Sequence, residues 1–122
     1  HDALPIWRVS VERGPIVYCA EWPDNKCNVH TVLLNQHPQF KVVEKPELLY
    51  GISQLKTDAQ ALSYDKNGKL ITKDTELTLI PYYAWAHRGE GDMEVWLPID
   101  VSAASALPQE VQKWEDNGFF KN

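Results

Sequence analysis

The residues that could bind a metal ion lie in the first third of the chain. Cys19, Cys27, His30 and His37 are its soft ligands close in sequence, with the spacing C-x7-C-x2-H-x6-H. This spacing matches no familiar zinc arrangement. Cys19 and His30 also fall in segments whose apolar alternation already explains them. The sequence therefore predicts no metal site and no cofactor here. A lone Cys19 is no better as a nucleophile, because structural cysteines are usually inert.

Three carboxylates, Glu90, Asp92 and Glu94, lie close together in the stretch LTLIPYYAWAHRGEGDMEVWLP at 77–98. A glycosidase needs two carboxylates about 5 to 10 Å apart in a cleft that holds a sugar. These three fall in an expected hairpin turn, so we interpret them as a solvated turn. Glu21 flanks a strand, where pairing with Arg13 is the simpler role. No phosphate-loop or nucleophile-elbow motif is present, and the sequence predicts no catalytic residue.

Aromatic side chains in the same stretch suggest two alternative roles. If 77–86 and 93–99 pair as a hairpin across HRGEGD, side chains alternate between two faces. The face expected in the core carries Leu79, Tyr83, Trp85, Met93, Val95 and Leu97. The opposite face carries Ile80, Tyr82, Ala84, Glu94 and Trp96. Tyr82 and Trp96, with Trp22, could form an exposed platform for sugar rings, or they could be covered by a neighbouring domain.

Composition and charge exclude several classes of partner. The chain has 122 residues, which suits one domain, and a net charge of -5 with scattered lysines and arginines. Nucleic acid and anionic membranes are therefore not expected as partners, because both require clustered cations. The longest apolar run is far short of the about 20 residues that span a bilayer. The start HDALPIW is not a signal peptide, and the sequence leaves the compartment open among soluble, periplasmic, secreted and cytoplasmic locations.

Hydrophobic periodicity indicates an all-β domain. The period is mostly two, which is typical of half-buried strands. Strands are expected at 6–12, 13–22, 27–35, 40–45, 51–64, 77–86 and 93–99, with turns at 23–25 and at 65–70, where Asn67-Gly68 favours positive φ. Segment 51–64 fits a strand about as well as a short helix, and the surrounding strands favour the strand. We therefore predict a jelly-roll-like β-sandwich of about seven or eight strands over 1–101.

The remaining segment, 102–122, breaks the alternation. Small residues give way to a run led by Pro108, and Gly118 is placed as a C-terminal stop. This tail is therefore expected to contain a short helix. The two cysteines flank the turn CAEWPDNKC, and free thiols in partly buried positions are favoured over a disulfide.

Two blocks of the sequence resemble the C-terminal region of glycoside hydrolase family 127, which includes β-L-arabinofuranosidases and proteins once classed as a domain of unknown function. The first is RGPIVYCAEWPDN at 13–25 and the second is LTLIPYYAWAHRGEGDMEVWLP at 77–98. The blocks are long and in the family's order. The segment from about 36 to 76 adds little to the match.

This resemblance implies what the chain lacks. Family members carry catalysis in a large (α/α)6 barrel on the N-terminal side, with a cysteine nucleophile in a zinc site of cysteines and a glutamate. The chain matches only the β-sandwich that follows. The resemblance thus implies a non-catalytic accessory domain of a bacterial glycoside hydrolase, which packs on the barrel or on a second copy as a homodimer. A carbohydrate-binding module is the alternative, and an isolated chain that hydrolyses no β-L-arabinofuranoside is expected.

Arg13 is the fourth candidate for a contact, beside Tyr82, Trp96 and Trp22. It stands before Gly14 and Pro15, at the entry of the second expected strand. A guanidinium at such a corner is expected to have a partner. The internal candidates are Glu21, Asp24 and the acidic turn 90–94, and a carboxylate on the barrel is the external one.

Overall fold

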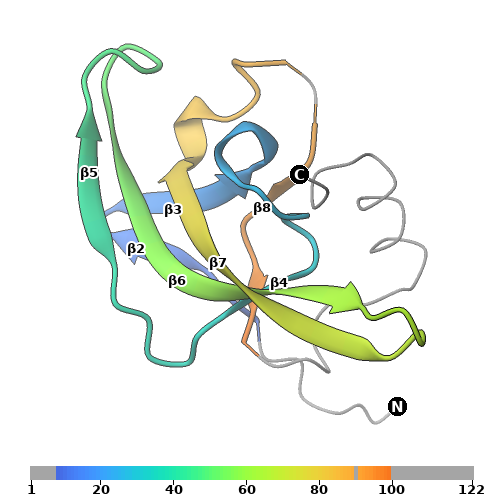
Figure 1. The fold of residues 1–122 in the computed structure, drawn as a ribbon. Coiled ribbons are helices and arrows are strands. Elements are labelled where there is room, and N and C mark those ends of the chain that lie inside the picture. Colours follow the sequence, from blue (N-terminus) through green and yellow to red (C-terminus); the bar gives the residue numbers. More distant parts are fainter. Residues whose placement is uncertain (1–7, 90, 100–122) are drawn as a thin grey trace, which may run out of the picture.

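The computed structural model describes residues 8–89 and 91–99 (Figure 1). They form nine strands and two single-turn 3-10 helices. The strands are β1 (Arg8–Val9), β2 (Val11–Arg13), β3 (Ile16–Glu21), β4 (Val32–Leu34), β5 (Lys41–Lys45), β6 (Ile52–Tyr64), β7 (Leu70–Pro81), β8 (Met93–Glu94) and β9 (Leu97–Pro98). The 3-10 helices are η1 (Trp22–Asp24) and η2 (Tyr82–Ala84). The prediction of an all-β, sandwich-like fold is confirmed.

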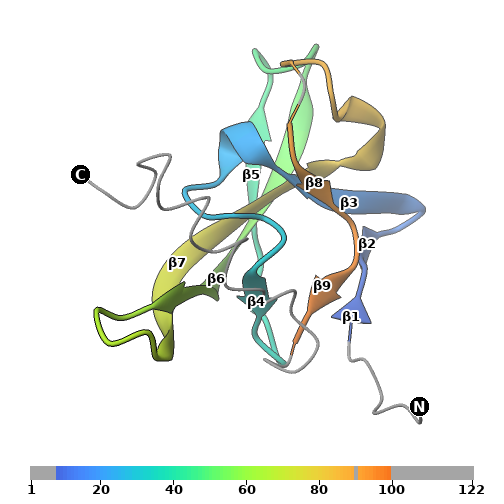
Figure 2. The same cartoon turned by 90° about the vertical axis from the view of Figure 1, so that its right-hand side faces the viewer.

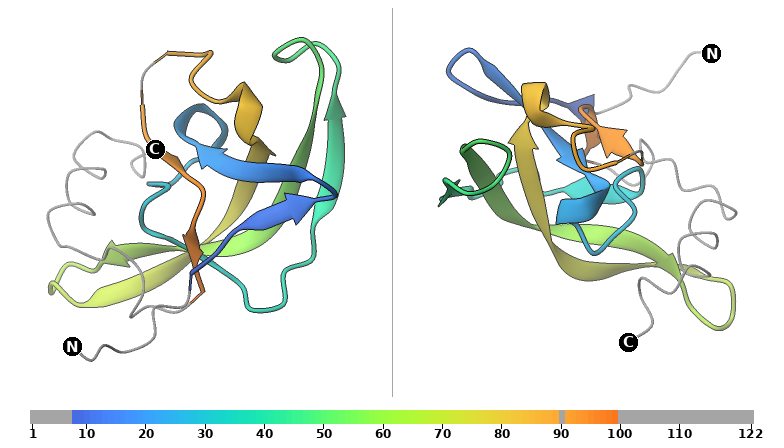
Figure 3. Two further views of the ribbon diagram at one scale, coloured as in Figure 1. Left: turned by 180° about the vertical axis from the view of Figure 1, so that it is seen from behind. Right: turned by 90° about the horizontal axis from the view of Figure 1, so that it is seen from above.

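The strands form one large, strongly bent sheet and one short ribbon. The large sheet has the order β2-β3-β7-β6-β4, with β5 also pairing β6 and β8 also pairing β3. All these pairs are antiparallel. The ribbon consists of β1 and β9, and β9 also contacts β4. In Figure 2, β1 and β9 lie side by side next to β4 and below β2 and β3, and Figure 3 shows the same strands from behind and from above, so the bent sheet nearly closes on itself.

The long β6–β7 hairpin is the spine of the domain. Ten consecutive pairs run from Leu55↔Leu79 to Tyr64↔Leu70. The other edge of β6 pairs first with β5 and then with β4. The turn at the tip is fixed by Asp65, whose carboxylate accepts the backbone N–H groups of Asn67 and Lys69. The predicted turn is confirmed, although only Gly68, at φ 80°, takes the positive φ expected of both Asn67 and Gly68.

The main core lies between the two layers of the bent sheet. Alternate residues of β6 and β7 point into it, among them Leu55, Ala59, Leu77 and Leu79. Leu97 of β9 closes it from the opposite side and is fully buried. Alternation of period two therefore places one face of each long strand in the core, as the pattern predicts.

A second core covers the outer face at the end of β7. Cys19, Ile52, Ile80 and Ala84 are its buried members. The segments that cover them are the β5–β6 connection and the chain after β7, including Trp85 and Met93. Both faces of the sheet are thus buried at this end, which explains the run of apolar residues LTLIP at the end of β7.

Asn25 joins η1 to β7 by side-chain hydrogen bonds. Its amide nitrogen donates to the carbonyls of Glu21 and Thr78, at 2.9 and 3.0 Å, and its carbonyl oxygen accepts the Thr78 N–H at 2.7 Å. One side chain therefore satisfies backbone groups at the point where β3 ends.

The expected strand 27–35 is shorter in the structure, where it is β4 (Val32–Leu34). Residues before Val32 form turns, in which Asn28 accepts hydrogen bonds from the backbone N–H groups of His30 and Thr31.

The predicted hairpin between 77–86 and 93–99 is wrong. β7 ends at Pro81, the chain turns through η2, and Ala86 has a left-handed φ of 71°. β8 pairs with β3 through Ala20↔Glu94, and β9 pairs with β1. β8 thus pairs with the free edge of β3 and not with β7. The partners of both β8 and β9 therefore come from the N-terminal part of the chain. The expected tail 102–122, with its helix, and the boundary at 101 lie outside the described residues.

Candidate interaction site

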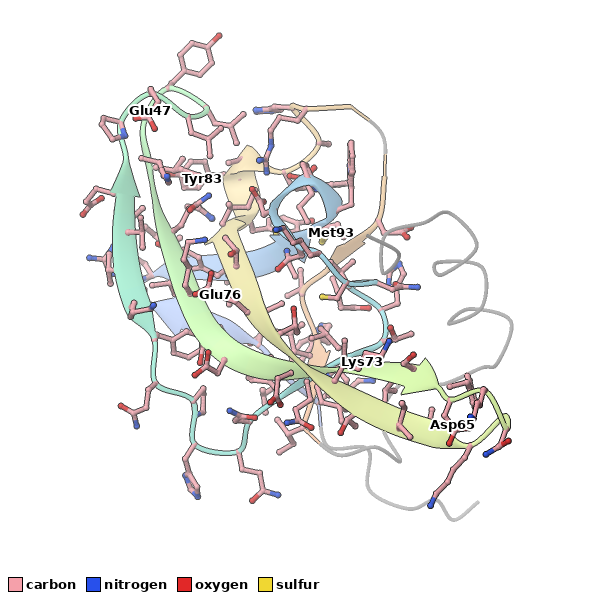
Figure 4. All side chains as sticks on the ribbon, viewed as in Figure 1. Glu47, Asp65, Lys73, Glu76, Tyr83 and Met93 are labelled. Carbon is pink, nitrogen blue, oxygen red and sulfur yellow. The ribbon has the colours of Figure 1, made fainter. Side chains whose placement is uncertain are left out.

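Most chemistry-bearing residues gather at one end of the domain. η1, η2, residues 85–89 and 91–92, and the β5–β6 connection all lie at this end, which is the top of Figures 1 and 2. Figure 4 shows Tyr83 on η2 below the β5–β6 connection, while Asp65 marks the opposite tip. Residues 85–89 and 91–92 lie beside η1, where Arg88 binds Asp24 and Gly91 lies against the Trp22 ring.

An ion-pair network holds this segment down. Arg88 binds Asp24 with both terminal nitrogens, at 2.6 and 2.7 Å, and Glu21 at 3.0 Å. The Glu21 side chain is 1% exposed and that of Asp24 is 5% exposed. The second carboxylate oxygen of Glu21 accepts the backbone N–H of Ala86 at 2.9 Å. Such charge-assisted, bidentate contacts are strong and directional, and the Asp24 hydrogen bond raises the pKa of Arg88 above its ordinary value.

The same network surrounds one of the cysteines. Burial, and then the charges of Glu21 and Asp24, raise the pKa of the Cys19 thiol to about 12. Burial alone raises the pKa of Cys27 to about 12. Both residues are free and buried, as the prediction of free thiols requires. Thiols with such a pKa are poor nucleophiles near neutral pH, because the thiolate is the reactive form.

Trp22 supports the segment from below. A Cβ added to Gly91 would lie 2.1 Å from Cδ1 of the Trp22 ring, so any side chain there would force the ring to move. The backbone N–H of Trp22 also donates to the Asp92 carbonyl at 3.0 Å. Trp22 remains 38% exposed. The Trp22 ring therefore packs against Gly89 and Gly91, and these glycines have a structural purpose that the short sequence does not reveal.

His30 ties the end of the segment to the turn before β4. Its Nδ1 lies 3.1 Å from a Glu94 oxygen, and its Nε2 lies 3.4 Å from an Asp92 oxygen. The hydrogen bond with Glu94 is the main cause that raises the pKa of His30 above 6.5, and Asp92 adds to it against the opposing effect of burial. The interpretation of Asp92 and Glu94 as solvated turn residues is therefore wrong for Glu94, which is partly buried and paired.

Tyr82 and Trp96 lie together on one groove, which we call the aromatic groove. It has a volume of about 470 Å³ and is lined by Val17, Tyr82, Met93, Glu94, Val95 and Trp96. Tyr82 is 44% exposed and Trp96 is 56% exposed. Figure 4 places Met93 on the strand that forms this wall. The expected grouping of Tyr82, Trp96 and Glu94 is found, although it arises from β3–β8 pairing rather than from the expected hairpin.

Other predictions for the aromatic stretch differ from the structure. Tyr83, expected in the core, is 65% exposed, whereas Ile80 and Ala84, expected on the open face, are buried. Arg13 is exposed at the end of β2, and Arg88 rather than Arg13 binds Glu21 and Asp24. Those two internal partners proposed for Arg13 are therefore wrong.

The described residues contain no group of three or more metal-binding side chains, and none of their helices is long and apolar enough to cross a membrane. Sequence reasoning missed Arg88, Asn25 and His30 as organising residues. Each acts on partners far along the chain, such as Glu21 and Arg88, which are 67 residues apart. The sequence feature that points to these roles is the occurrence of one arginine together with several acidic residues around tight turns.

Comparisons with known proteins give consistent relatives. A model of the glycoside hydrolase family 127 C-terminal domain matches residues 6–98. A non-reducing end β-L-arabinofuranosidase of Bifidobacterium longum subsp. longum is 31% identical over 101 residues, which cover 73% of this chain and 15% of that protein.

Solved structures of family 127 enzymes are also similar to this chain. A family 127 β-arabinofuranosidase is 86% identical with a TM-score of 0.78, over 80% of this chain and 16% of that one. A family 127 β-L-arabinofuranosidase from Geobacillus stearothermophilus T6 is 33% identical with a TM-score of 0.66, over 75% and 15%. The chain thus spans about one sixth of the length of these relatives.

Proposed function

The chain belongs to the glycoside hydrolase family 127 C-terminal domain, whose model matches residues 6–98, and on that premise we propose that it is a non-catalytic accessory domain. The larger protein would be a glycoside hydrolase of the β-L-arabinofuranosidase type. Relatives with that name extend over roughly six times the length that this chain matches. Catalysis would then be carried by the part that has no counterpart here.

The non-catalytic role rests on one observation: the carboxylates at this end of the domain are already bound by other side chains. Glycoside hydrolysis needs two carboxyl groups across a sugar-holding cleft. Within the part of the chain that the structure describes, the aromatic groove is lined by one carboxylate, Glu94, and His30 already binds it. Glu21 and Asp24 are buried and bound by Arg88. Neither the groove nor the Arg88 network therefore presents a general acid and a general base to a substrate.

The zinc chemistry implied by the family is likewise assigned to the catalytic barrel. Cys19 and Cys27 are buried thiols with a pKa of about 12. Among the described residues, no group of three or more metal-binding side chains gathers around either cysteine. The implied zinc would then be held by the barrel, and the residues of this domain would serve the enzyme by binding and positioning.

The aromatic groove is the surface that would contact the barrel. Tyr82 and Trp96 are exposed, and Val17, Met93 and Val95 make the remaining wall largely apolar. Aromatic residues and methionine are enriched at the centres of protein interfaces. The segment behind the groove is held rigidly by Arg88 and His30, so docking would cost little ordering entropy.

The test is association with the separately expressed catalytic region, measured by calorimetry and sedimentation. The double variant Tyr82→Ser, Trp96→Ser should lose association. Tyr50→Ser should keep it, because Tyr50 is equally aromatic and fully exposed but lies on the β5–β6 connection, away from the groove. Sedimentation of the chain alone reports whether two copies pair through the same groove. Association that survives the double variant, or turnover of an aryl β-L-arabinofuranoside by the chain alone, would contradict the proposal.

A carbohydrate-binding module is the second candidate, and the groove itself favours it. Two exposed rings and a carboxylate are the groups that hold sugar faces and hydroxyls. Titration with arabinose oligosaccharides separates the two roles. Saturable shifts of the Trp96 indole N–H, lost in Trp96→Ser, would establish sugar binding. Absence of shifts at millimolar sugar, together with association through the groove, would leave the docking role.

A further inference from the structure

His30 is held between two carboxylates of one segment. Its two ring nitrogens reach Asp92 and Glu94 on opposite sides, at 3.4 and 3.1 Å. The His30 side chain is 32% exposed, that of Glu94 is 21% exposed and that of Asp92 is 59% exposed. A neutral imidazole has one N–H donor and one lone pair, whereas the protonated ring has two donors. Only the protonated ring can therefore donate to both carboxylates.

The backbone is held in place on both sides of the bridge between His30 and the two carboxylates. On one side, Asn28 accepts the backbone N–H of His30 at 2.9 Å and that of Thr31 at 2.9 Å, which fixes the turn. On the other side, Glu94 is paired with Ala20 in the sheet, and the Asp92 carbonyl accepts the Trp22 N–H. A change in the ring's hydrogen bonds is therefore passed to the segment 92–94 rather than absorbed by a loose loop.

Glu94 connects this bridge to the aromatic groove. The same side chain that binds His30 lines the groove, between Met93 and Val95. The three groups do not form a metal site, because the ring nitrogens face away from each other and their partners do not converge on one point. No converging metal-binding group occurs among residues 8–89 and 91–99.

We propose that His30 is a proton-operated latch that ties Asp92 and Glu94 to the turn before β4, and that its deprotonation releases one carboxylate and shifts the wall of the aromatic groove. Within the described residues, the titratable groups recorded against the ring are these two carboxylates. With the ring protonated, the three groups carry a net charge of -1. With the ring neutral, the charge is -2, and the lone pair faces an anion.

The sign of the pH dependence follows from the bridge. The pKa of His30 is raised, chiefly by the Glu94 hydrogen bond. The stabilisation is therefore complete below the unfolded value of about 6.5, and it is lost as the pH rises through the higher folded value. The latch is closed in mildly acidic solution and opens toward alkaline pH.

The test uses the chain's single methionine, Met93, as a probe inside the groove. A pH titration by NMR follows the His30 ring, assigned with His30→Gln, and the Met93 methyl signal. The His30 midpoint should lie above 6.5 and should fall in Glu94→Gln, and less in Asp92→Asn. The methyl signal should move with the same midpoint and become pH-independent over that range in His30→Gln. His37→Gln, which removes an exposed histidine, is the matched control and should leave both curves unchanged.

Two results would overturn the latch. A wild-type His30 midpoint at or below 6.5 would show that the carboxylates do not hold the proton, and this measurement needs no variant to fold. A Met93 methyl signal that does not follow the His30 midpoint would show that protonation does not reach the groove. Either result leaves the docking proposal intact, because association with the catalytic region is measured independently.

Discussion

Arg88 is partly exposed, yet we expect its substitution to lower the stability of the domain as much as the loss of a buried residue would. Its side chain is 21% exposed, yet it makes three charge-assisted hydrogen bonds to Glu21 and Asp24. Arg88→Met keeps much of the apolar stem and removes the charge. Glu21, at 1% exposure, would then keep a single hydrogen bond, from the Ala86 N–H. Asp24 would be left buried and without its cation.

Breaking a buried ion pair by removing one partner costs about 3 to 5 kcal/mol. Arg88 is partly accessible, and its Nε is buried without a partner among the described residues. The wild-type network is therefore imperfect, and the lower end of the range applies. We expect Arg88→Met to lower the free energy of unfolding by about 3 kcal/mol. This corresponds to a fall in Tm of roughly 10 to 20 °C.

Urea unfolding followed by tryptophan fluorescence measures this loss, provided that the m-value is unchanged. The control is Arg13→Met, which removes an exposed arginine and should stay within about 0.5 kcal/mol of wild type. Arg88→Lys should be intermediate, because an ammonium cannot make the bidentate contact. Adding Asp24→Asn to Arg88→Met should recover part of the loss, because it removes an uncompensated charge. A loss for Arg88→Met no larger than that of the control would refute the reasoning.

Three further outcomes are expected. Gly91→Ala would bring a Cβ to 2.1 Å from Trp22 Cδ1, so the ring must move; a shifted emission maximum and a loss of about 1 to 3 kcal/mol in urea unfolding are expected, and an unchanged spectrum would contradict this. Asn25→Ala should cost about 2 to 4 kcal/mol in the same assay, because it strips three backbone groups of their partner. Cys19 and Cys27, with a pKa of about 12, should resist alkylation at pH 8 until denaturant is added, and fast labelling of the native chain would count against their burial.

Strands with local signals could be predicted from the sequence. The alternation of Val9 and Val11 with polar neighbours indicates the β1–β2 segment, and Asp65 to Gly68 marks the tip of the long hairpin. The two-residue period and a tight turn are both encoded within a few positions. The family resemblance, confirmed by the match over 6–98, rests on similarly continuous blocks.

Pairing partners and burial at the end of β7 could not be predicted in the same way. Sequence proximity favours a hairpin between β7 and the segment after Gly91, but the edge of β3 binds β8 instead. The 3-10 helix η2 at the end of β7 also leaves Tyr83 exposed and Ala84 buried. Whether a strand pairs with its neighbour or with a distant edge depends on the tertiary arrangement, because both alternatives satisfy the local pattern.

The antiparallel β1–β9 ribbon has a consequence for the order in which the domain folds. Arg8 donates to the Trp96 carbonyl across 88 positions, whereas the β6–β7 hairpin closes between Tyr64 and Leu70. By loop-closure entropy, the first contact costs about 2.4 kcal/mol more than the second. We therefore expect the hairpin to form first and the β1–β9 ribbon to form late in folding.

The aromatic groove belongs to the late part of this sequence of events. Its walls come from β3, η2, β8 and Trp96 just before β9, which are brought together by contacts between distant parts of the chain. A chain that ends before Leu97 would keep the long hairpin but would lack the ribbon that closes the core. Completion of the last few strand residues, rather than formation of the spine, therefore determines when the aromatic groove first takes its final shape.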